Sequence, residues 1–412
     1  MAGTARCQVP HAVVAGGGIG GLTAAIALHR TGWRVTVLER AGSLEPVGAG
    51  IGLAPNSQRA LDVLGLGDRV RGLSAWQGTG GVRAGNGRWL VRTSTAATER
   101  EFGGGLVSLH RATLVDLLVG ALPADCLRLG IEARLVDPGG PGRTAVVATG
   151  DGDIEADLVV GADGIDSRVR SALFPAHPGP RYAGFTAWRL VVPAPEDPFE
   201  PHETWGRGGV WGTHPLKDGR VYAYATALVP QGGRAPDSEK AELERRFARW
   251  HDPIPEIIAG ARPEDVLRND VRHLIEPLPA YHRGRTALLG DAAHAMAPTL
   301  GQGGNQAIED AVVLAHHLAP DTDLFAGLAA YSAARVPRTT AIVRQSARTA
   351  RLNHLTDGTL IAVRDTLLRT ACRIGPNMIM RGFAAIADWR PPGPPYAAGT
   401  DAGAQERASA RR

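Results

Sequence analysis

Residues 12–40 contain the pattern that most constrains how this chain can fold. A short apolar run is followed by a glycine-rich turn, a small-residue segment typical of a helix, and a second apolar run that ends in an acid. Three glycines of the turn stand in the G-x-G-x-x-G spacing: Gly16, Gly18 and Gly21. Glu39 ends the second run, 39 − 21 = 18 residues after the last glycine. The order predicts a strand–helix–strand unit at the centre of a parallel sheet.

Each position in this pattern has a physical reason. Gly16 permits a sharp turn, Gly18 leaves room for a pyrophosphate beside the backbone, and Gly21 lets the helix pack closely. The free N–H groups at the helix N-terminus would bind the phosphates. The carboxylate of Glu39 would bind a ribose hydroxyl and repel a 2′-phosphate, which favours the AMP half of FAD or NAD over NADP. The alternative is an ordinary glycine turn.

The composition narrows the class of protein. With 412 residues, 44% hydrophobic and 21% charged, the chain can bury a large core, in roughly two to three domains. A net charge of +4 without a basic block gives no support to nucleic-acid binding. The cysteines, Cys7, Cys126 and Cys372, have neither a metal spacing nor a disulfide framework. No signal peptide and no membrane span is evident, so we expect a cytoplasmic protein.

Two later loops also follow apolar runs. Leu158–Val160 leads into GADG, which contains Asp163 and Gly164. A second run ends at Gly290 and Asp291, and a loop leads from there to a helix expected from about 305 to 318. In open α/β sheets, ligands bind at the carboxyl edge of the strands. We therefore expect both loops at a ligand-binding edge.

Two helices are expected between Glu39 and the GADG loop. Asn56 is predicted to cap a helix that runs to about Leu64. Leucines at helical spacing predict another helix within 108–122, beginning near His110 and Arg111. Arg111 is a candidate contact for a phosphate or ribityl group, with a plain surface arginine as the alternative.

Residues 182–230 differ from the preceding part, because they are rich in aromatic and β-forming residues. Asp218-Gly219 predicts a two-residue hairpin, and the segment predicts an antiparallel sheet. Tyr222 and Tyr224 should share one face of a strand. Six side chains are the expected wall of a pocket for a flat or apolar small molecule: Trp188, Arg189, Trp205, Trp211, Tyr222 and Tyr224. The alternative is that the aromatic face packs on a helix as core.

The ordered set of GGGIGG with Glu39, GADG at 161–164 and GDAAH…P…GQGGN at 290–305 resembles one known family over about residues 10–345. This is the single-component (class A) flavoprotein monooxygenases, of the para-hydroxybenzoate hydroxylase-like and salicylate hydroxylase-like kind. The resemblance implies FAD as cofactor, NADH or NADPH as transient reductant, and O2 as co-substrate. A flavin C4a-hydroperoxide would then hydroxylate an aromatic or other electron-rich small molecule. Epoxidation of an alkene or indole, and a flavin oxidoreductase without oxygen insertion, stay open as alternatives.

The resemblance also implies site residues. The cofactor-binding positions would be Gly16, Gly18, Gly20, Gly21, Glu39, Arg40, Arg111, Asp163, Gly164, Gly290, Asp291, Gly303, Gly304 and Asn305. Arg111 matches an arginine near the flavin phosphate and ribityl groups, and Asp291 an aspartate that binds the ribityl chain. The implied catalytic positions are the helix start facing the flavin ring and a proline on the oxygen-reaction side: Gly303, Gly304, Asn305 and Pro298. Backbone N–H groups and the helix dipole would stabilise the anionic reduced flavin.

Two further expectations complete the site. His294, beside Asp291, is expected to satisfy backbone groups and not to act in catalysis. No metal site is expected, because the adjacent His316 and His317 do not share a helix face.

These expectations combine into an α/β fold with two interleaved parts. The FAD-binding, Rossmann-like part is expected from 1–75, 103–178 and 268–345. An antiparallel substrate-binding sheet is expected from 76–102 and 179–267. C-terminal helices at 346–390 would brace the unit or form a subunit contact in a monomer or homodimer, and 391–412 is expected to be a disordered tail.

Overall fold

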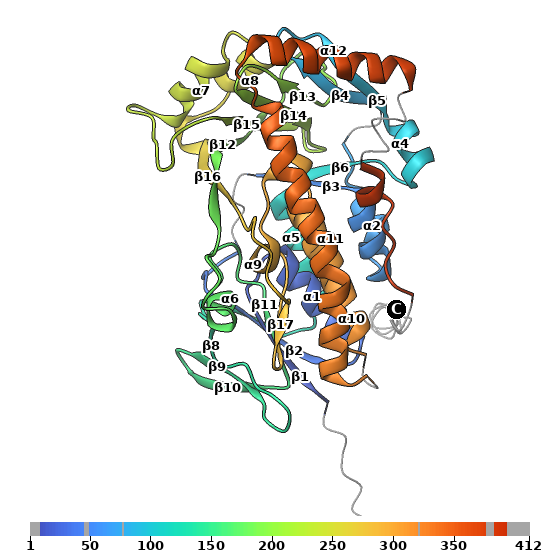
Figure 1. Ribbon diagram of the computed structural model, residues 1–412, viewed down its shortest axis with the longest axis vertical. Helices are drawn as coiled ribbons and strands as arrows, with labels where there is room; N and C mark the ends of the chain where they lie inside the picture. Colours follow the sequence, from blue (N-terminus) through green and yellow to red (C-terminus); the bar gives the residue numbers. More distant parts are fainter. Residues whose placement is uncertain (1–8, 45–48, 76–77, 320–321, 376–382, 394–412) are drawn as a thin grey trace, which may run out of the picture.

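The computed structural model describes residues 9–44, 49–75, 78–319, 322–375 and 383–393. Figure 1 shows two sheet-containing parts stacked along the long axis, with helix α11 (Leu324–Asn353) running beside both. Nearly all of the expected tail, 391–412, lies outside the described residues. Within the described ranges, no helix is both long and apolar enough to cross a membrane.

The N-terminal pattern forms the centre of a six-stranded sheet, as predicted. β1 (His11–Ala15) pairs in parallel with β2 (Arg34–Glu39), and α1 (Ile19–Arg30) connects them. The order is β17–β18–β11–β1–β2–β7. The other strands are β7 (Leu127–Leu129), β11 (Leu158–Gly161), β17 (His282–Arg283) and β18 (Thr286–Leu288). All neighbours except β17 and β18 are parallel, so the predicted loops after β1, β11 and β18 meet at one edge.

Small residues allow close packing of helices on this sheet. α1 contacts both α10 (Gly303–His317) and α5 (Arg111–Val119). A side chain at Gly20 would place its Cβ 2.7 Å from Leu289 Cδ1 and 3.1 Å from Ala307 Cβ, so this glycine permits the contact of α1 with α10. The helix after Arg111 begins where it was predicted, and α10 begins two residues before the expected Asn305.

A seven-stranded sheet forms the other part, in the order β16–β12–β15–β14–β13–β4–β5. Its strands are β4 (Thr79–Ala84), β5 (Trp89–Ser94), β12 (Arg181–Pro193), β13 (His202–Trp205), β14 (Gly209–Pro215), β15 (Arg220–Ala227) and β16 (Leu267–His273). The expected hairpin joins β14 to β15, with Gly219 at φ +79°. Neighbours are antiparallel apart from β13 and β4, which run parallel. The expected division at residue 268 falls inside β16.

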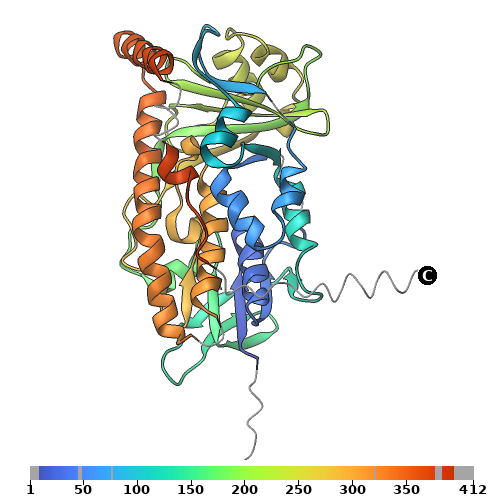
Figure 2. The same ribbon diagram turned by 90° about the vertical axis from the view of Figure 1, so that its right-hand side faces the viewer.

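Smaller elements connect and cover the two sheets. Two small sheets are formed by β3 (Gly50–Leu53) with β6 (Val107–His110), and by the antiparallel strands β8 (Arg134–Asp137), β9 (Ala145–Thr149) and β10 (Gly152–Ala156). Further helices are α2 (Pro55–Val63), α3 (Gly67–Arg71), α4 (Thr95–Phe102), α6 (Arg168–Leu173), α7 (Glu239–Phe247), α8 (Ile254–Ala259), α9 (Asp291–His294) and α12 (Gly358–Ile374). Residues Pro263–Asp265 and Pro298–Leu300 form 3-10 turns. In Figure 2, α11 follows one side of the molecule along both parts, and α12 lies at the end beside the seven-stranded sheet.

Candidate active site

The glycine turn after β1 is closed on one side and open on the other. Gly16 has φ +115°, and a Cβ there would lie 2.3 Å from the Ala162 carbonyl oxygen. A Cβ at Gly21 would lie 2.0 Å from the Gly16 carbonyl oxygen, so both positions require glycine. A Cβ at Gly18 would meet no atom within 4 Å. The open side at Gly18, before the N-terminus of α1, is therefore a space into which phosphates fit.

Glu39 lies beside this turn, at the end of β2. Its Oε2 accepts a hydrogen bond from the Gly17 N–H at 2.6 Å, and its Oε1 accepts one from the Ala41 N–H at 2.8 Å. These bonds hold the carboxylate at the carboxyl edge of the sheet, next to the phosphate space. Arg40 follows as an exposed side chain.

Asp163 lies in the loop after β11, close to the same edge. Its Oδ2 accepts hydrogen bonds from the N–H groups of Arg168 (2.8 Å) and Val169 (3.1 Å), at the start of α6. Its Oδ1 is buried and has no partner among the described residues. Gly164 follows with φ +78°, which turns the chain. One oxygen of Asp163 is thus structural, and the other is left for a ligand or water.

Arg111, at the start of α5, and Asp291, at the start of α9, lie close enough for their charges to interact. Both side chains are exposed to solvent, yet the surrounding protein desolvates them. This desolvation and the charge of Arg189 lower the pKa of Arg111, while Asp291 acts in the opposite direction. Burial raises the pKa of Asp291, against the opposing charges of His294, Arg111 and Arg189. The structure therefore brings together two groups predicted to contact the flavin phosphate and ribityl chain.

The start of α10 lies beside Asp291. Gly303 lies beside Asp291, since a Cβ on the glycine would be 3.8 Å from Asp291 Oδ1. The N-cap residue, Gln302, makes no side-chain capping bond, and the first N–H groups of a helix have no intrahelical acceptor. The helix start therefore presents free donors and a partial positive charge, as the sequence predicts. Pro298 is exposed in the turn before it.

The Asn305 side chain has a structural role. Its Oδ1 accepts hydrogen bonds from the Ala54 N–H at 2.9 Å and Ser57 Oγ at 2.5 Å, while its Nδ2 donates to the Gly52 carbonyl at 2.9 Å. These bonds fix α10 to β3 and α2. Any contact of Asn305 with a cofactor is therefore left to its backbone N–H.

The His294 side chain contacts a carboxylate, so the expectation that it satisfies backbone groups is wrong. That it does not act in catalysis stays a prediction. Its Nε2 lies 2.5 Å from Asp310 Oδ2, which also accepts from the Gly290 N–H at 2.9 Å, and Asp310 Oδ1 accepts from Arg335 Nε at 2.6 Å. Burial alone would raise the pKa of Asp310, but His294, Arg335 and the Gly290 N–H outweigh it and hold that pKa at about 2. The network fixes the loop that presents Asp291.

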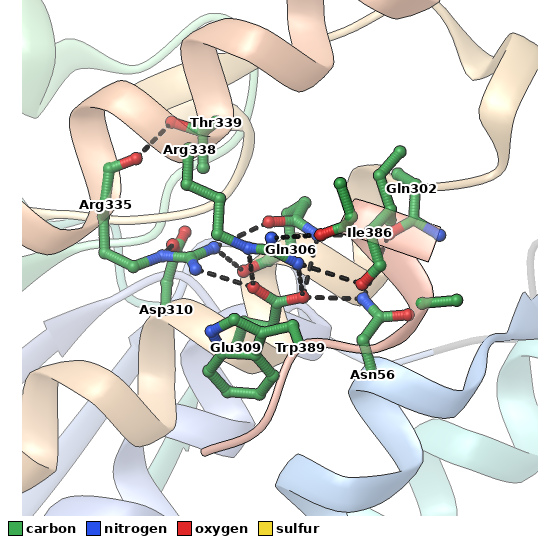
Figure 3. Close-up of polar contacts among 12 residues, drawn as sticks. Asn56, Gln302, Gln306, Glu309, Asp310, Arg335, Arg338, Thr339, Ile386 and Trp389 are labelled. Carbon is green, nitrogen blue, oxygen red and sulfur yellow. Dashed lines mark hydrogen bonds and ion pairs between the residues drawn. The ribbon is translucent and has the colours of Figure 1, made fainter. Parts of the chain in front are cut away.

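Figure 3 shows how this network continues to Glu309, which is fully buried. Glu309 accepts hydrogen bonds from Arg335 Nη1 at 2.6 Å, Arg338 Nε at 2.7 Å and Asn56 Nδ2 at 2.6 Å. The predicted cap at Asn56 is wrong, because Ala54 is the N-cap of α2 and the Asn56 side chain points to α10. The sequence signal that was missed is the presence of Gln306, Glu309 and Asp310 in a helix buried along most of its length.

The six expected pocket residues divide between the two faces of the seven-stranded sheet. Tyr222 and Tyr224 share a face as predicted, with ring centroids 5.8 Å apart. Strand register puts Arg189 and Trp205 on that face. Trp188 and Trp211 lie on the other face, in the core that α7 and α8 cover, and are 1% and 0% exposed. These two tryptophans are therefore removed from the expected pocket wall.

A pocket of about 270 Å³, partly open to solvent, lies on the tyrosine face. Its lining includes Tyr224 and three residues that sequence reasoning missed: Ser108, Glu203 and His214. The His214 ring stacks on both tyrosines, with centroids 5.8 Å from Tyr224 and 6.4 Å from Tyr222. Burial lowers the pKa of His214 to about 4, so its ring is neutral at pH 7. No local pattern marks these residues, because four separate strands bring them together.

The pocket and the helix start are connected by β3 and β6. A Cβ at Gly304 would lie 2.8 Å from Ile51 Cδ1, and one at Gly50 would lie 2.3 Å from Tyr222 Cδ1. β3 pairs with β6, which contributes Ser108. The glycine turn, the charged pair and the helix start lie at one edge of the six-stranded sheet, and β3 and β6 lie between the helix start and the aromatic face.

Comparisons with known proteins agree with this geometry. Residues 9–346 match the family described as FAD binding domain. Aurachin C monooxygenase/isomerase of Stigmatella aurantiaca is 37% identical over 359 residues, 87% of this chain and 93% of that protein. The FAD-dependent urate hydroxylase of Klebsiella pneumoniae is 32% identical over 349 residues, 83% of this chain and 90% of that protein.

Solved structures show the same fold. The complex of Klebsiella pneumoniae HpxO with FAD and uric acid has a TM-score of 0.83 and 29% identity, and the match covers 91% of this chain and 97% of that one. A salicylate hydroxylase substrate complex, 24% identical, matches in fold with a TM-score of 0.71 over 93% of this chain and 98% of that one. This chain therefore belongs to the FAD binding domain family and is an FAD-dependent enzyme of the class A flavin monooxygenases.

Proposed function

We propose that this enzyme takes electrons from NADH or NADPH and one oxygen atom from O2 to hydroxylate an electron-rich aromatic small molecule. When bound and reduced, FAD would supply the activation of O2. One observation supports this reading above the others: the face that bears Tyr222 and Tyr224 lies across β3 from the free N–H groups at the start of α10, because Gly50 packs on Tyr222 and Ile51 packs on Gly304.

The residues around the cofactor space have separable roles. Gly16 and Gly18 leave the phosphate space open, and Arg111 would bind phosphate by charge. Asp291 would accept a hydrogen bond from a ribityl hydroxyl. Gly303 and Gly304 would direct backbone N–H groups at negative charge on the reduced ring, where donors fixed in advance are most effective.

The aromatic face has a second role, which is to exclude water. Tyr222 lies directly on Gly50, so the seven-stranded sheet closes on β3 without a gap at that point. Water exclusion strengthens the electrostatic contacts inside a site and prevents loss of reactive intermediates.

The purified protein tests the proposal directly. It should be yellow, contain FAD, and oxidise NADH or NADPH with O2 faster when phenols or indoles are added. With 18O2, one labelled atom should enter the ring of the product. A protein that is colourless and refuses added FAD would disprove the proposal, and an unlabelled product would show flavin oxidation without oxygen insertion. Its monomeric or homodimeric state stays a prediction, which light scattering on the eluted peak can test.

A further inference from the structure

We propose that Glu203 selects the substrate, by accepting a hydrogen bond from an O–H or N–H group on an aromatic ring that has no carboxylate of its own. The inference rests on the proposed function and extends it to a class of substrate.

Glu203 is placed at the pocket by β13. It lines the pocket, and strand register puts it on the face that bears Tyr224. Its Oε1 accepts a hydrogen bond from the Tyr224 hydroxyl at 2.7 Å, and its Oε2 accepts one from Trp205 Nε1 at 2.5 Å. A carboxylate offers about four acceptor sites, so both oxygens keep capacity for a further donor. The two donors fix the carboxylate in place before any ligand arrives.

The charge of Glu203 is not compensated by a cation. Among the described residues, no ion pair joins it to arginine or lysine, and neither residue type lines the pocket. Burial raises the pKa of Glu203, while the bonds from Trp205 and Tyr224 oppose that rise. A buried acceptor without a cation is stabilised by a ligand that donates a hydrogen bond, and it repels a ligand carboxylate.

The remaining lining agrees with this ligand. Ser108, Thr95, Thr98 and the neutral His214 offer uncharged polar groups, and Leu106 and Pro215 offer apolar surface. The Ser108 hydroxyl lies 3.5 Å from His214 Nδ1, which joins β6 to the stacked rings of β14 and β15. The pocket therefore receives a flat, uncharged ring between β6 and the tyrosine face, with Glu203 at its polar end.

Three probes on the FAD-loaded protein test this class: 1-naphthol, 1-methoxynaphthalene, which lacks the donor, and 1-hydroxy-2-naphthoate, which adds a carboxylate. Binding is followed by the change in flavin absorbance and by calorimetry. We expect 1-naphthol to bind about tenfold or more tightly than either of the others, the usual scale of a hydrogen bond to a charged acceptor.

The matched variants are Glu203→Gln and Glu239→Gln. Glu239 also accepts a bond from an indole, Trp188 Nε1 at 2.7 Å, on the opposite face of the same sheet. Glu203→Gln should remove most of the preference for 1-naphthol, and Glu239→Gln should keep it. If Glu203→Gln does not fold, the ranking of the three probes on the unaltered protein still tests the proposed class of substrate.

Tightest binding of 1-hydroxy-2-naphthoate, equal binding of 1-naphthol and its methyl ether, or equal effects of the two variants would each overturn the assignment. The same samples are assayed for FAD content and for NADH and NADPH oxidation. Failure of those assays with the probe preference intact would refute the proposed reaction and leave the role of Glu203 standing.

Discussion

Replacing Glu309 with alanine tests the buried network of Figure 3. The carboxylate accepts five hydrogen bonds, from Arg335 Nη1 (2.6 Å), Arg338 Nε (2.7 Å) and Nη2 (2.9 Å), Asn56 Nδ2 (2.6 Å) and Gln306 Nε2 (2.9 Å). The Arg335 side chain is 1% exposed, so water cannot replace the lost partner. Removing one member of a buried ion pair costs about 3–5 kcal/mol of folding free energy.

The remaining contacts put the expected value at the lower end of that range. Arg335 keeps its bond to Asp310 at 2.6 Å, and Arg338 keeps the carbonyls of Ala385 (2.9 Å) and Ile386 (3.1 Å). We therefore expect Glu309→Ala to lower the free energy of unfolding by about 3 kcal/mol.

Urea unfolding followed by tryptophan fluorescence, with FAD saturating throughout, measures this loss. The control is Asp166→Ala, which removes an ion pair with Arg272 of similar lengths, 2.7 and 2.8 Å, whose side chains are 69% and 32% exposed. That pair should contribute about 0–1 kcal/mol. If Glu309→Ala destabilises the protein no more than Asp166→Ala, the reasoning about uncompensated buried charge is refuted.

Three further predictions concern the site. Gly304→Pro removes a backbone N–H within the first helical turn, where proline is tolerated, while Gly304→Ala keeps that N–H. Stopped-flow absorbance should show slower flavin reduction in the proline variant alone. Equal rates of flavin reduction in the two variants would exclude this N–H as a donor to the flavin. Arg111→Leu should weaken FAD binding by about tenfold or more in a fluorescence titration, whereas Arg111→Lys, which keeps the charge, should lose less. Burial lowers the pKa of His202 to about 4, so the unfolded chain takes up a proton that the folded one does not as pH falls below 6.5. The free energy of unfolding should therefore fall between pH 7.5 and pH 5, and this fall should be about 2 kcal/mol smaller in His202→Gln. An equal fall in both proteins would show that His202 is not its cause.

The parts of the site predicted from sequence are those whose geometry is local. The turn at Gly16 and the carboxylate at Glu39 follow from short spacings, because a strand–turn–helix unit fixes its own backbone. The helix start at Gly303 came from the family resemblance, since the pattern alone placed it near Asn305. Tyr222 and Tyr224 could be placed on one face because strand side chains alternate.

The errors and omissions are non-local. By the same alternation, the adjacent Trp188 and Arg189 cannot both face one pocket, and only the register with neighbouring strands decides which of them does. Glu203 reaches the pocket because β13 pairs with β14, and Asn56 turns away from its own helix end because α10 offers a buried carboxylate. Such pairings depend on residues far apart in the chain, so no short sequence motif predicts them.

Helix α11 links the chemistry of the two parts. Near its middle, Arg335 holds Asp310 and so the loop of Asp291, while beyond its far end His354 Nε2 lies 2.9 Å from Thr226 Oγ1 in β15. One continuous helix of 30 residues thus sets the distance between the loop of Asp291 and the strand that bears both tyrosines. The two anchors, at Arg335 and His354, hold the aromatic sheet in position relative to the cofactor-binding edge, and neither residue lines the pocket.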